Sequence, residues 1–128
     1  MLIAINALCI KTHRSVLLLK KKEIWILPGG KPNVGEDDFT CLTRENSEEL
    51  PKAFFQIGEF YNEFTGITPH SGAELTARVY LAKVKGDLTP SAEISSAQFF
   101  TVEEMQQIPL SDITRKILDA VVKTGHLL

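Results

Sequence analysis

Cysteine is scarce in this sequence, and the patterns that depend on it are absent. Cys9 and Cys41 are the two cysteines among 128 residues, and their spacing fits neither a disulfide framework nor a zinc site. Both lie in apolar surroundings, so we expect buried free thiols in a reducing compartment. The composition therefore favours a soluble, cytoplasmic protein.

Long apolar runs and an excess of positive charge are also missing. No run reaches the roughly 18 to 20 residues that a membrane-spanning helix needs. Residues 2–10 are apolar but lack a preceding basic region and a following small-residue cleavage site, so we interpret them as a strand and not as a signal peptide. The formal net charge of −2 argues against broad nucleic-acid binding. We therefore expect no membrane partner, and an anionic ligand would need metal ions or local basic residues.

What the sequence does contain is typical of one globular domain. Hydrophobic residues make up 44% and charged residues 23% of the chain, which is ordinary for a folded protein. The length is near the usual size of one domain, and no repeat, low-complexity tract or linker interrupts it. We therefore expect a single domain over residues 1–128.

Short apolar or alternating segments predict the strands. Residues 74–84 alternate most cleanly, which places Arg78 and Tyr80 on the polar face of their strand. The strands that we expect are 2–10, 15–20, 24–27, 53–61, 74–84 and 98–100.

Residues 36–50 change to helical spacing and predict an internal helix. Phe39, Leu42 and Leu50 fall on one side of it, which we expect to be buried. Pro51 cannot continue the helix and moves the preceding residue out of helical geometry. The helix is therefore expected to end sharply at Leu50.

Two further helices are predicted near the end of the sequence. Thr101 and Glu104 resemble a capping box that opens a short helix. Ser111 is a suitable N-cap for a terminal helix that runs to about Thr124, with Gly125 just beyond it. Strands before and after one internal helix, with a second long helix closing the chain, favour an α/β fold. We expect a mixed sheet sandwiched between helices, an α/β/α sandwich.

Three glutamates carry the clearest chemical signal. Glu45, Glu48 and Glu49 stand at helical positions i, i+3 and i+4, so they share one face. Carboxylates this close repel one another and raise each other's pKa. They are either solvated residues on an exposed face or ligands of a hard divalent cation such as Mg²⁺. Arg44, next to them, can pair with one carboxylate and hold its rotamer.

The preceding loop favours the second interpretation. Gly29 and Gly30 end a strand and let backbone groups approach a ligand closely. The segment resembles the signature of the Nudix family, G-x5-E-x7-R-E-U-x-E-E-x-G-U, in which U is a bulky aliphatic residue. The matching residues are Gly30, Glu36, Arg44, Glu45, Glu48 and Glu49. The resemblance covers nearly the whole chain, is greatest to small MutT-like members, and implies the Nudix fold.

The sequence departs from the signature at three positions. Asn46 and Lys52 replace aliphatic residues, and Pro51 replaces a glycine. Asn46 faces the expected core, where an unpaired amide would cost about 1–3 kcal/mol, so it should have a hydrogen-bond partner. None of these changes removes an expected metal ligand, but they put the tilt of the helix in question.

The resemblance implies a role for each matched residue. Glu45, Glu48 and Glu49, with the carbonyl of Gly30, are expected to hold Mg²⁺, for which Mn²⁺ could substitute. Arg44 is expected to orient a glutamate, and Glu36 to support the loop. A carboxylate must also accept a proton from the attacking water. Its identity stays open among Glu45, Glu49 and the later Glu93, which could equally be a solvated loop residue.

Substrate contacts are less constrained by the pattern. Lys31 and Arg14 could bind phosphates, although isolated surface cations are usually only solvated. Arg78 and Tyr80 could contact a sugar or a base from the polar face of their strand.

The reaction that we expect is the hydrolysis of a small nucleotide-like substrate, most simply a nucleoside triphosphate to its monophosphate and pyrophosphate. ADP-ribose, nucleotide sugars, dinucleoside polyphosphates and capped RNA are alternatives within the family. A nucleotide-binding module without turnover is the alternative outside the enzyme class. Many relatives form dimers, so a homodimer is compatible with the resemblance.

Overall fold

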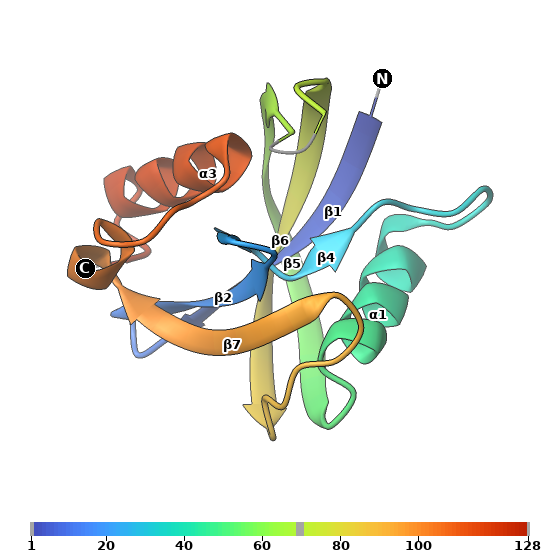
Figure 1. Ribbon diagram of the computed structural model, residues 1–128, viewed down its shortest axis with the longest axis horizontal. Coiled ribbons are helices and arrows are strands. Elements are labelled where there is room, and N and C mark those ends of the chain that lie inside the picture. Colours follow the sequence, from blue (N-terminus) through green and yellow to red (C-terminus); the bar gives the residue numbers. More distant parts are fainter. Residues whose placement is uncertain (1, 69–70, 128) are drawn as a thin grey trace.

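The computed structural model describes residues 2–68 and 71–127 (Figure 1). Every predicted strand and helix is present, and β5 and β7 are longer than predicted. The two-residue β4 was not predicted. In chain order the elements are β1 (Leu2–Lys11), β2 (Ser15–Lys21), β3 (Ile24–Ile26), β4 (Gly29–Gly30), α1 (Asp38–Glu49), β5 (Ala53–Ile67), β6 (Glu74–Gly86), β7 (Ile94–Thr101), α2 (Val102–Met105) and α3 (Asp112–Lys123).

The strands form one mixed sheet in the order β3-β2-β1-β6-β5. β1 and β6 are parallel, with Leu2 opposite Leu75, whereas β5 pairs with β6 and β2 pairs with β1 in antiparallel fashion. β4 also pairs with β1, and β7 pairs with β2. In Figure 1, β2 and β7 cross the direction of β5 and β6. The expected mixed sheet is confirmed, and β1 is the strand that joins its two halves.

Each face of the sheet carries its own apolar cluster and its own long helix (Figure 1). On one side Cys41, Leu42 and Leu50, from α1 and its end, pack with Ile5 and other residues of the sheet. On the other side α3 contributes buried aliphatic residues to a larger cluster. These are Ile113, Ile117, Leu118 and Val121. Helices therefore cover both faces, as the predicted α/β/α sandwich requires, and both cysteines are buried and free as predicted.

The start of α1 differs from the prediction. Asp37 is its N-cap and accepts a hydrogen bond from Thr40 N at 2.7 Å, so Glu36 stays in the loop. The prediction that Phe39 is buried is wrong, because its side chain is 63% exposed. Phe39 lies in the first turn of α1, where it lines a small cavity, and it belongs to neither apolar cluster.

The later helices begin where their sequence signals predicted. Thr101 and Glu104 form a capping box in which each side chain accepts from the other residue's backbone N–H. Ser111 caps α3 by accepting from Thr114 N, and Gly125 follows the helix with φ +78°. No helix within residues 2–68 and 71–127 is long and apolar enough to cross a membrane.

Candidate active site

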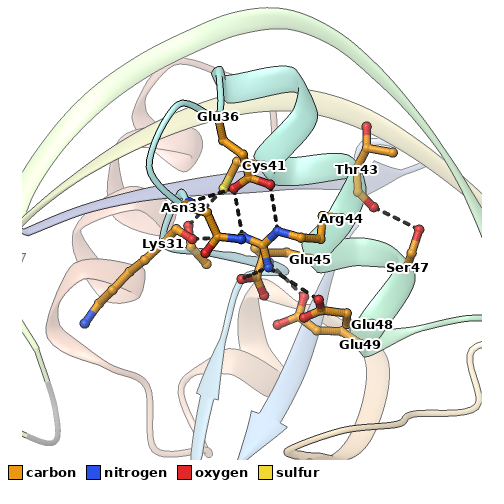
Figure 2. A network of polar contacts seen from close by, with 12 residues as sticks. Lys31, Asn33, Glu36, Cys41, Thr43, Arg44, Glu45, Ser47, Glu48 and Glu49 are labelled. Carbon is orange, nitrogen blue, oxygen red and sulfur yellow. Dashed lines mark hydrogen bonds and ion pairs between the residues drawn. The ribbon is translucent and has the colours of Figure 1, made fainter.

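Arg44 joins the loop before α1 to the acidic face of the helix (Figure 2). Its Nε and Nη2 donate to the two oxygens of Glu36 at 2.7 and 2.9 Å. Nη1 donates to Glu45 at 3.0 Å and to Glu48 at 3.4 Å, and Nη2 also reaches the carbonyl of Lys31. The hydrogen bonds from Arg44, together with one from Asn33 N, lower the pKa of Glu36 to about 2. Glu36 is therefore an ionised support for Arg44, which in turn orients two of the three glutamates.

The glycines of β4 bring backbone against these glutamates. Gly29 has φ +134°, and a Cβ there would lie 2.0 Å from the carbonyl oxygen of Ile5. A Cβ on Gly30 would lie 2.5 Å from the carboxyl carbon of Glu45. Gly29 N donates to Glu49 Oε1 at 3.0 Å. At Gly29 only glycine fits, and at Gly30 a side chain would displace the Glu45 carboxylate, so β4 and the acidic face of α1 form one structural unit.

Burial sets the electrostatics of the helix face. Glu49 is 7% exposed, and removal from water raises its pKa to about 8, against the opposing hydrogen bond from Gly29. Burial also raises the pKa of Glu45, although Arg44 opposes the shift. Lys21 lowers the pKa of both carboxylates, but burial outweighs the nearby cations at each of them. A cation would stabilise their charged forms.

The donor chemistry of this face fits a hard divalent cation. Glu45, Glu48 and Glu49 line one cavity together with Gly29 and Gly30. Over the described ranges, no three acidic, histidine or cysteine side chains form a ready-made group that could hold an ion. An open magnesium site does not need such a group, because Mg²⁺ keeps several waters and is commonly bound through one or two carboxylates and substrate phosphates. The oxygen-only donor set therefore suits Mg²⁺ or Mn²⁺.

The cavity itself measures about 660 Å³, and its lining is of two kinds. The charged lining consists of the glutamates and two lysines, Lys21 and Lys31. The rest is mostly aliphatic side chains of the sheet and of α3, with a few hydroxyls among them. This part of the lining includes Ala4, Leu27, Leu75, Ser111, Ile113, Thr114 and Ile117. A ligand with a charged part and an apolar part would match this mixed lining.

The predicted site residues fall into two groups in the structure. Those that line the cavity are Gly30, Lys31, Glu45, Glu48, Glu49 and Glu93. Of these, the side chain of Glu93 is 76% exposed, and its Oε2 forms an ion pair with Lys21 Nζ at 2.9 Å. In Figure 2 the Lys31 side chain extends away from Arg44.

Three predicted substrate contacts do not line this cavity. Arg14 is exposed in the turn between β1 and β2. Arg78 and Tyr80 extend from β6 to Asp38 at the start of α1, and both bind its carboxylate. Contact between these three residues and a substrate stays a prediction.

Sequence reasoning missed Lys21 and the contribution of α3. The predicted strand over 15–20 stopped one residue short of Lys21, which ends β2, forms an ion pair with Glu93 and lines the cavity with it. β2 does not alternate, because residues 16–19 are all buried, so no local pattern separates Lys21 from the neighbouring lysines. No local signal places Ile113 or Thr114 near the glutamates, because that proximity depends on the packing of α3 against the sheet.

Asn46 is buried as predicted, at 3% exposure, but it has no partner. Neither its Oδ1 nor its Nδ2 makes a hydrogen bond to any described residue, so the prediction of a partner is wrong. The inward face of α1 that carries it also holds Leu42 and packs on an apolar cluster.

Comparison with known proteins agrees with this geometry. A family model described as NUDIX domain matches residues 2–121, and no curated protein sequence matches. The crystal structure of a MutT NUDIX hydrolase from Burkholderia pseudomallei is 26% identical, with a TM-score of 0.79 over 94% of this chain and 97% of that one. A MutT protein from Methanosarcina mazei Go1 is 22% identical, with a TM-score of 0.81 over 97% and 94%. The NUDIX domain of Shewanella oneidensis NrtR, complexed with ADP ribose, is 14% identical, with a TM-score of 0.71 over 97% and 88%.

Proposed function

We propose, from the premise that this chain belongs to the NUDIX domain family, that its substrate is a nucleoside triphosphate. The chain is a Nudix pyrophosphohydrolase, and its family acts on small nucleotide-like substrates. The specific reaction that we infer is metal-dependent hydrolysis to a nucleoside monophosphate and pyrophosphate. The single observation that carries this proposal is one cavity that is lined both by the carboxylates of α1 and by aliphatic side chains of the sheet and α3.

The shape of the cavity supports a ligand of nucleotide size. Its volume of about 660 Å³ falls within the roughly 300 to 1,000 Å³ of small-molecule sites. Lys21 and Lys31 add positive charge to the lining that holds the carboxylates, which suits phosphates. Leu75, Ile113 and Ile117 of the same cavity offer apolar contact, by which a base could be removed from water.

The residues of the chain divide the work of hydrolysis. A bound divalent cation would supply charge stabilisation for the phosphoryl and leaving oxygens. Glu45, Glu48 and Glu49 would hold it, and Arg44 keeps two of these side chains in place. The third is held by Gly29 N. A water that attacks phosphorus must lose its proton to a nearby carboxylate, and Glu45, Glu49 and Glu93 all line the cavity.

A binding module without turnover is the second candidate. Asn46 and Pro51 favour it, because both differ from the family signature, Asn46 within the helix that carries the glutamates and Pro51 just after its C-cap. The intact set of Arg44, Glu45, Glu48 and Glu49 favours catalysis. We therefore place hydrolysis first.

The test is turnover by the purified protein against nucleoside triphosphates, oxidised and deoxy forms included, with Mg²⁺ or with EDTA. Nucleotide sugars, ADP-ribose and dinucleoside polyphosphates complete the panel. We expect metal-dependent release of a nucleoside monophosphate with a triphosphate as the best substrate. Better turnover of a diphosphate-linked substrate would overturn the substrate assignment but not the reaction class.

Glu48→Gln separates the two candidate functions. We expect it to lower kcat about 100-fold, because a metal ligand contributes several kcal/mol to transition-state stabilisation. Glu59→Gln is the matched control, since Glu59 is exposed on β5 and does not line the cavity. Protein whose melting temperature rises with Mg²⁺ and nucleotide, but which turns over no substrate, would favour the binding module.

A further inference from the structure

Asp38, Arg78 and Tyr80 form a compact polar group, which we call the Asp38 clamp. Arg78 Nε and Nη2 donate to Asp38 Oδ2 and Oδ1 at 2.9 and 2.7 Å, and Tyr80 OH donates to Oδ2 at 2.5 Å. The hydrogen bond from Arg78 is the main cause that lowers the pKa of Asp38. Both charged side chains are half-buried. This geometry is a bidentate pair supported by a hydroxyl, which fixes orientation as well as distance.

The clamp joins α1 to a row of paired residues that crosses the sheet and includes Gly30 of β4. Gly30 lies opposite Ile5 of β1, and Ile5 lies opposite Arg78 of β6. Arg78 therefore stands in the same row of the sheet as Gly30, one strand beyond β1. Asp38 is the first residue of α1. The clamp thus ties the beginning of the helix to the row that positions the Gly30 backbone.

The far end of α1 is tied to β4 itself. Glu49, its last residue, accepts from Gly29 N. Between the two ties, the Glu45 carboxylate packs against Gly30 so closely that a Cβ there would collide with it. A helix advances about 1.5 Å per residue, and a misplacement of about 1 Å can reduce a rate about 100-fold. Loss of one tie would free the helix to shift along the sheet by such an amount.

We propose that Asp38, Arg78 and Tyr80 are positioning residues that hold α1 in register with β4. In that register Glu45, Glu48, Glu49 and the Gly30 backbone are arranged for a divalent cation. This inference rests on the proposed function, because it takes the glutamates as metal ligands. None of the three clamp residues lines the large cavity, so their effect passes through the helix and not through the substrate.

The test measures the affinity of the purified protein for Mn²⁺ in the absence of substrate. The EPR signal of free Mn²⁺ reports how much of the ion remains unbound. Arg78→Lys keeps the charge but loses the bidentate geometry. We expect it to weaken Mn²⁺ binding about 10-fold and to lower kcat by a similar or larger factor, in the range known for residues that orient metal ligands. KM for the substrate should change less than about twofold. Asp38→Asn combined with Arg78→Lys should cost no more than the larger single change, because the two residues act as one device.

Two comparisons keep this test decisive. Val121→Ala removes buried apolar contact from α3 on the opposite face and should lower the melting temperature without changing Mn²⁺ affinity. Tyr80→Phe is the second variant, for the case that Arg78→Lys does not fold. It removes a single hydroxyl and should preserve the fold. It should also weaken Mn²⁺ binding, by a smaller factor than Arg78→Lys.

Several results would overturn the proposal. Unchanged Mn²⁺ affinity and kcat in Arg78→Lys, with only a lower melting temperature as in Val121→Ala, would reduce the clamp to a stabilising ion pair. A raised KM with unchanged kcat would make Arg78 a substrate contact. If the wild-type protein binds no Mn²⁺, the metal site and the clamp are overturned together. If the wild-type protein binds Mn²⁺ and Arg78→Lys binds it with the same affinity, the clamp alone is overturned.

Discussion

The two long helices lie on opposite faces of one sheet and both pack apolar side chains on it, but the balance of apolar and polar contacts differs. α3 buries aliphatic side chains, among them Ile117 and Val121, and has a polar tie at its start, where Asp112 accepts from Ile67 N at 3.0 Å. α1 buries Cys41 and Leu42 and is held at both of its ends by carboxylates, Asp38 and Glu49. Its inward face even carries Asn46, a buried amide without a partner. Hydrophobic burial is non-directional and tolerates small shifts, whereas bidentate polar contacts specify one position.

The difference follows from what each helix must do. α3 closes the apolar core and lines part of the cavity. Good apolar packing is sufficient for both roles. α1 presents charged side chains toward a shared point, and these charges oppose burial. We therefore expect changes in α3 to alter mainly stability, and changes in α1 to alter mainly turnover.

Glu49→Gln should give the largest effect and sharpen this contrast. Gln can still accept from Gly29 N, but it removes the charge of the carboxylate that we propose as a metal ligand. We expect kcat to fall about 100- to 1,000-fold, while the melting temperature in EDTA stays equal or rises, because a buried charge without a full partner is costly. Steady-state kinetics and scanning calorimetry measure the two quantities. A large fall in melting temperature would mean that Glu49 is mainly structural.

Leu118→Ala in α3 should show the opposite behaviour. The side chain is 4% exposed, and its truncation should lower the free energy of unfolding by about 2–5 kcal/mol. The folded fraction should keep its kcat, since Leu118 does not line the cavity. Urea unfolding followed by activity at low temperature checks both. Val122→Ala, at an exposed position of the same helix, is the control and should change stability little.

Asn46→Leu should increase the apolar contribution to the attachment of α1, as in α3. Replacing an unsatisfied buried amide by an apolar side chain should raise the free energy of unfolding by about 1–3 kcal/mol. Urea unfolding measures it, with Ser47→Ala on the exposed side of the same turn as the reference. A loss of stability would show that the Asn46 site does not accept an apolar side chain.

The pH dependence of stability should give the smallest effect. Hydrogen bonds from Arg78 keep the pKa of folded Asp38 below its usual value, so the carboxylate stabilises the fold above its unfolded pKa of about 3.9. That contribution is lost as the pH falls through the folded pKa. We expect wild-type protein to lose more stability than Asp38→Asn between pH 7 and pH 3, measured by urea unfolding. Parallel curves would contradict a stabilising clamp.

Local signals in the sequence predicted much of this structure. The caps Ser111 and Thr101 act within three residues of themselves, so their helices began where predicted. The spacing of Glu45, Glu48 and Glu49 placed them on one face of α1, and the three line one cavity.

Features that depend on distant partners were not predictable in the same way. Arg78 and Tyr80 were interpreted as polar residues of a strand, but their partner, Asp38, lies on another element. β4 is two residues long and exists because β1 pairs with it. Asn46 lacks a partner because of what surrounds it, which its own position in the helix does not specify.

The parallel pairing of β1 with β6 also has a kinetic consequence. It pairs Leu2 with Leu75 and Cys9 with Ala82. The hydrogen bonds between β1 and β6 can therefore form only when segments about 73 residues apart in the sequence come together. Contacts between such distant segments slow folding, because the loop entropy is lost before the contacts form. The row from Gly30 through Ile5 to Arg78 forms only at this step. Hydrolytic competence should therefore appear during refolding with the same rate constant as β1–β6 association, after the hairpin of β5 and β6 has already formed.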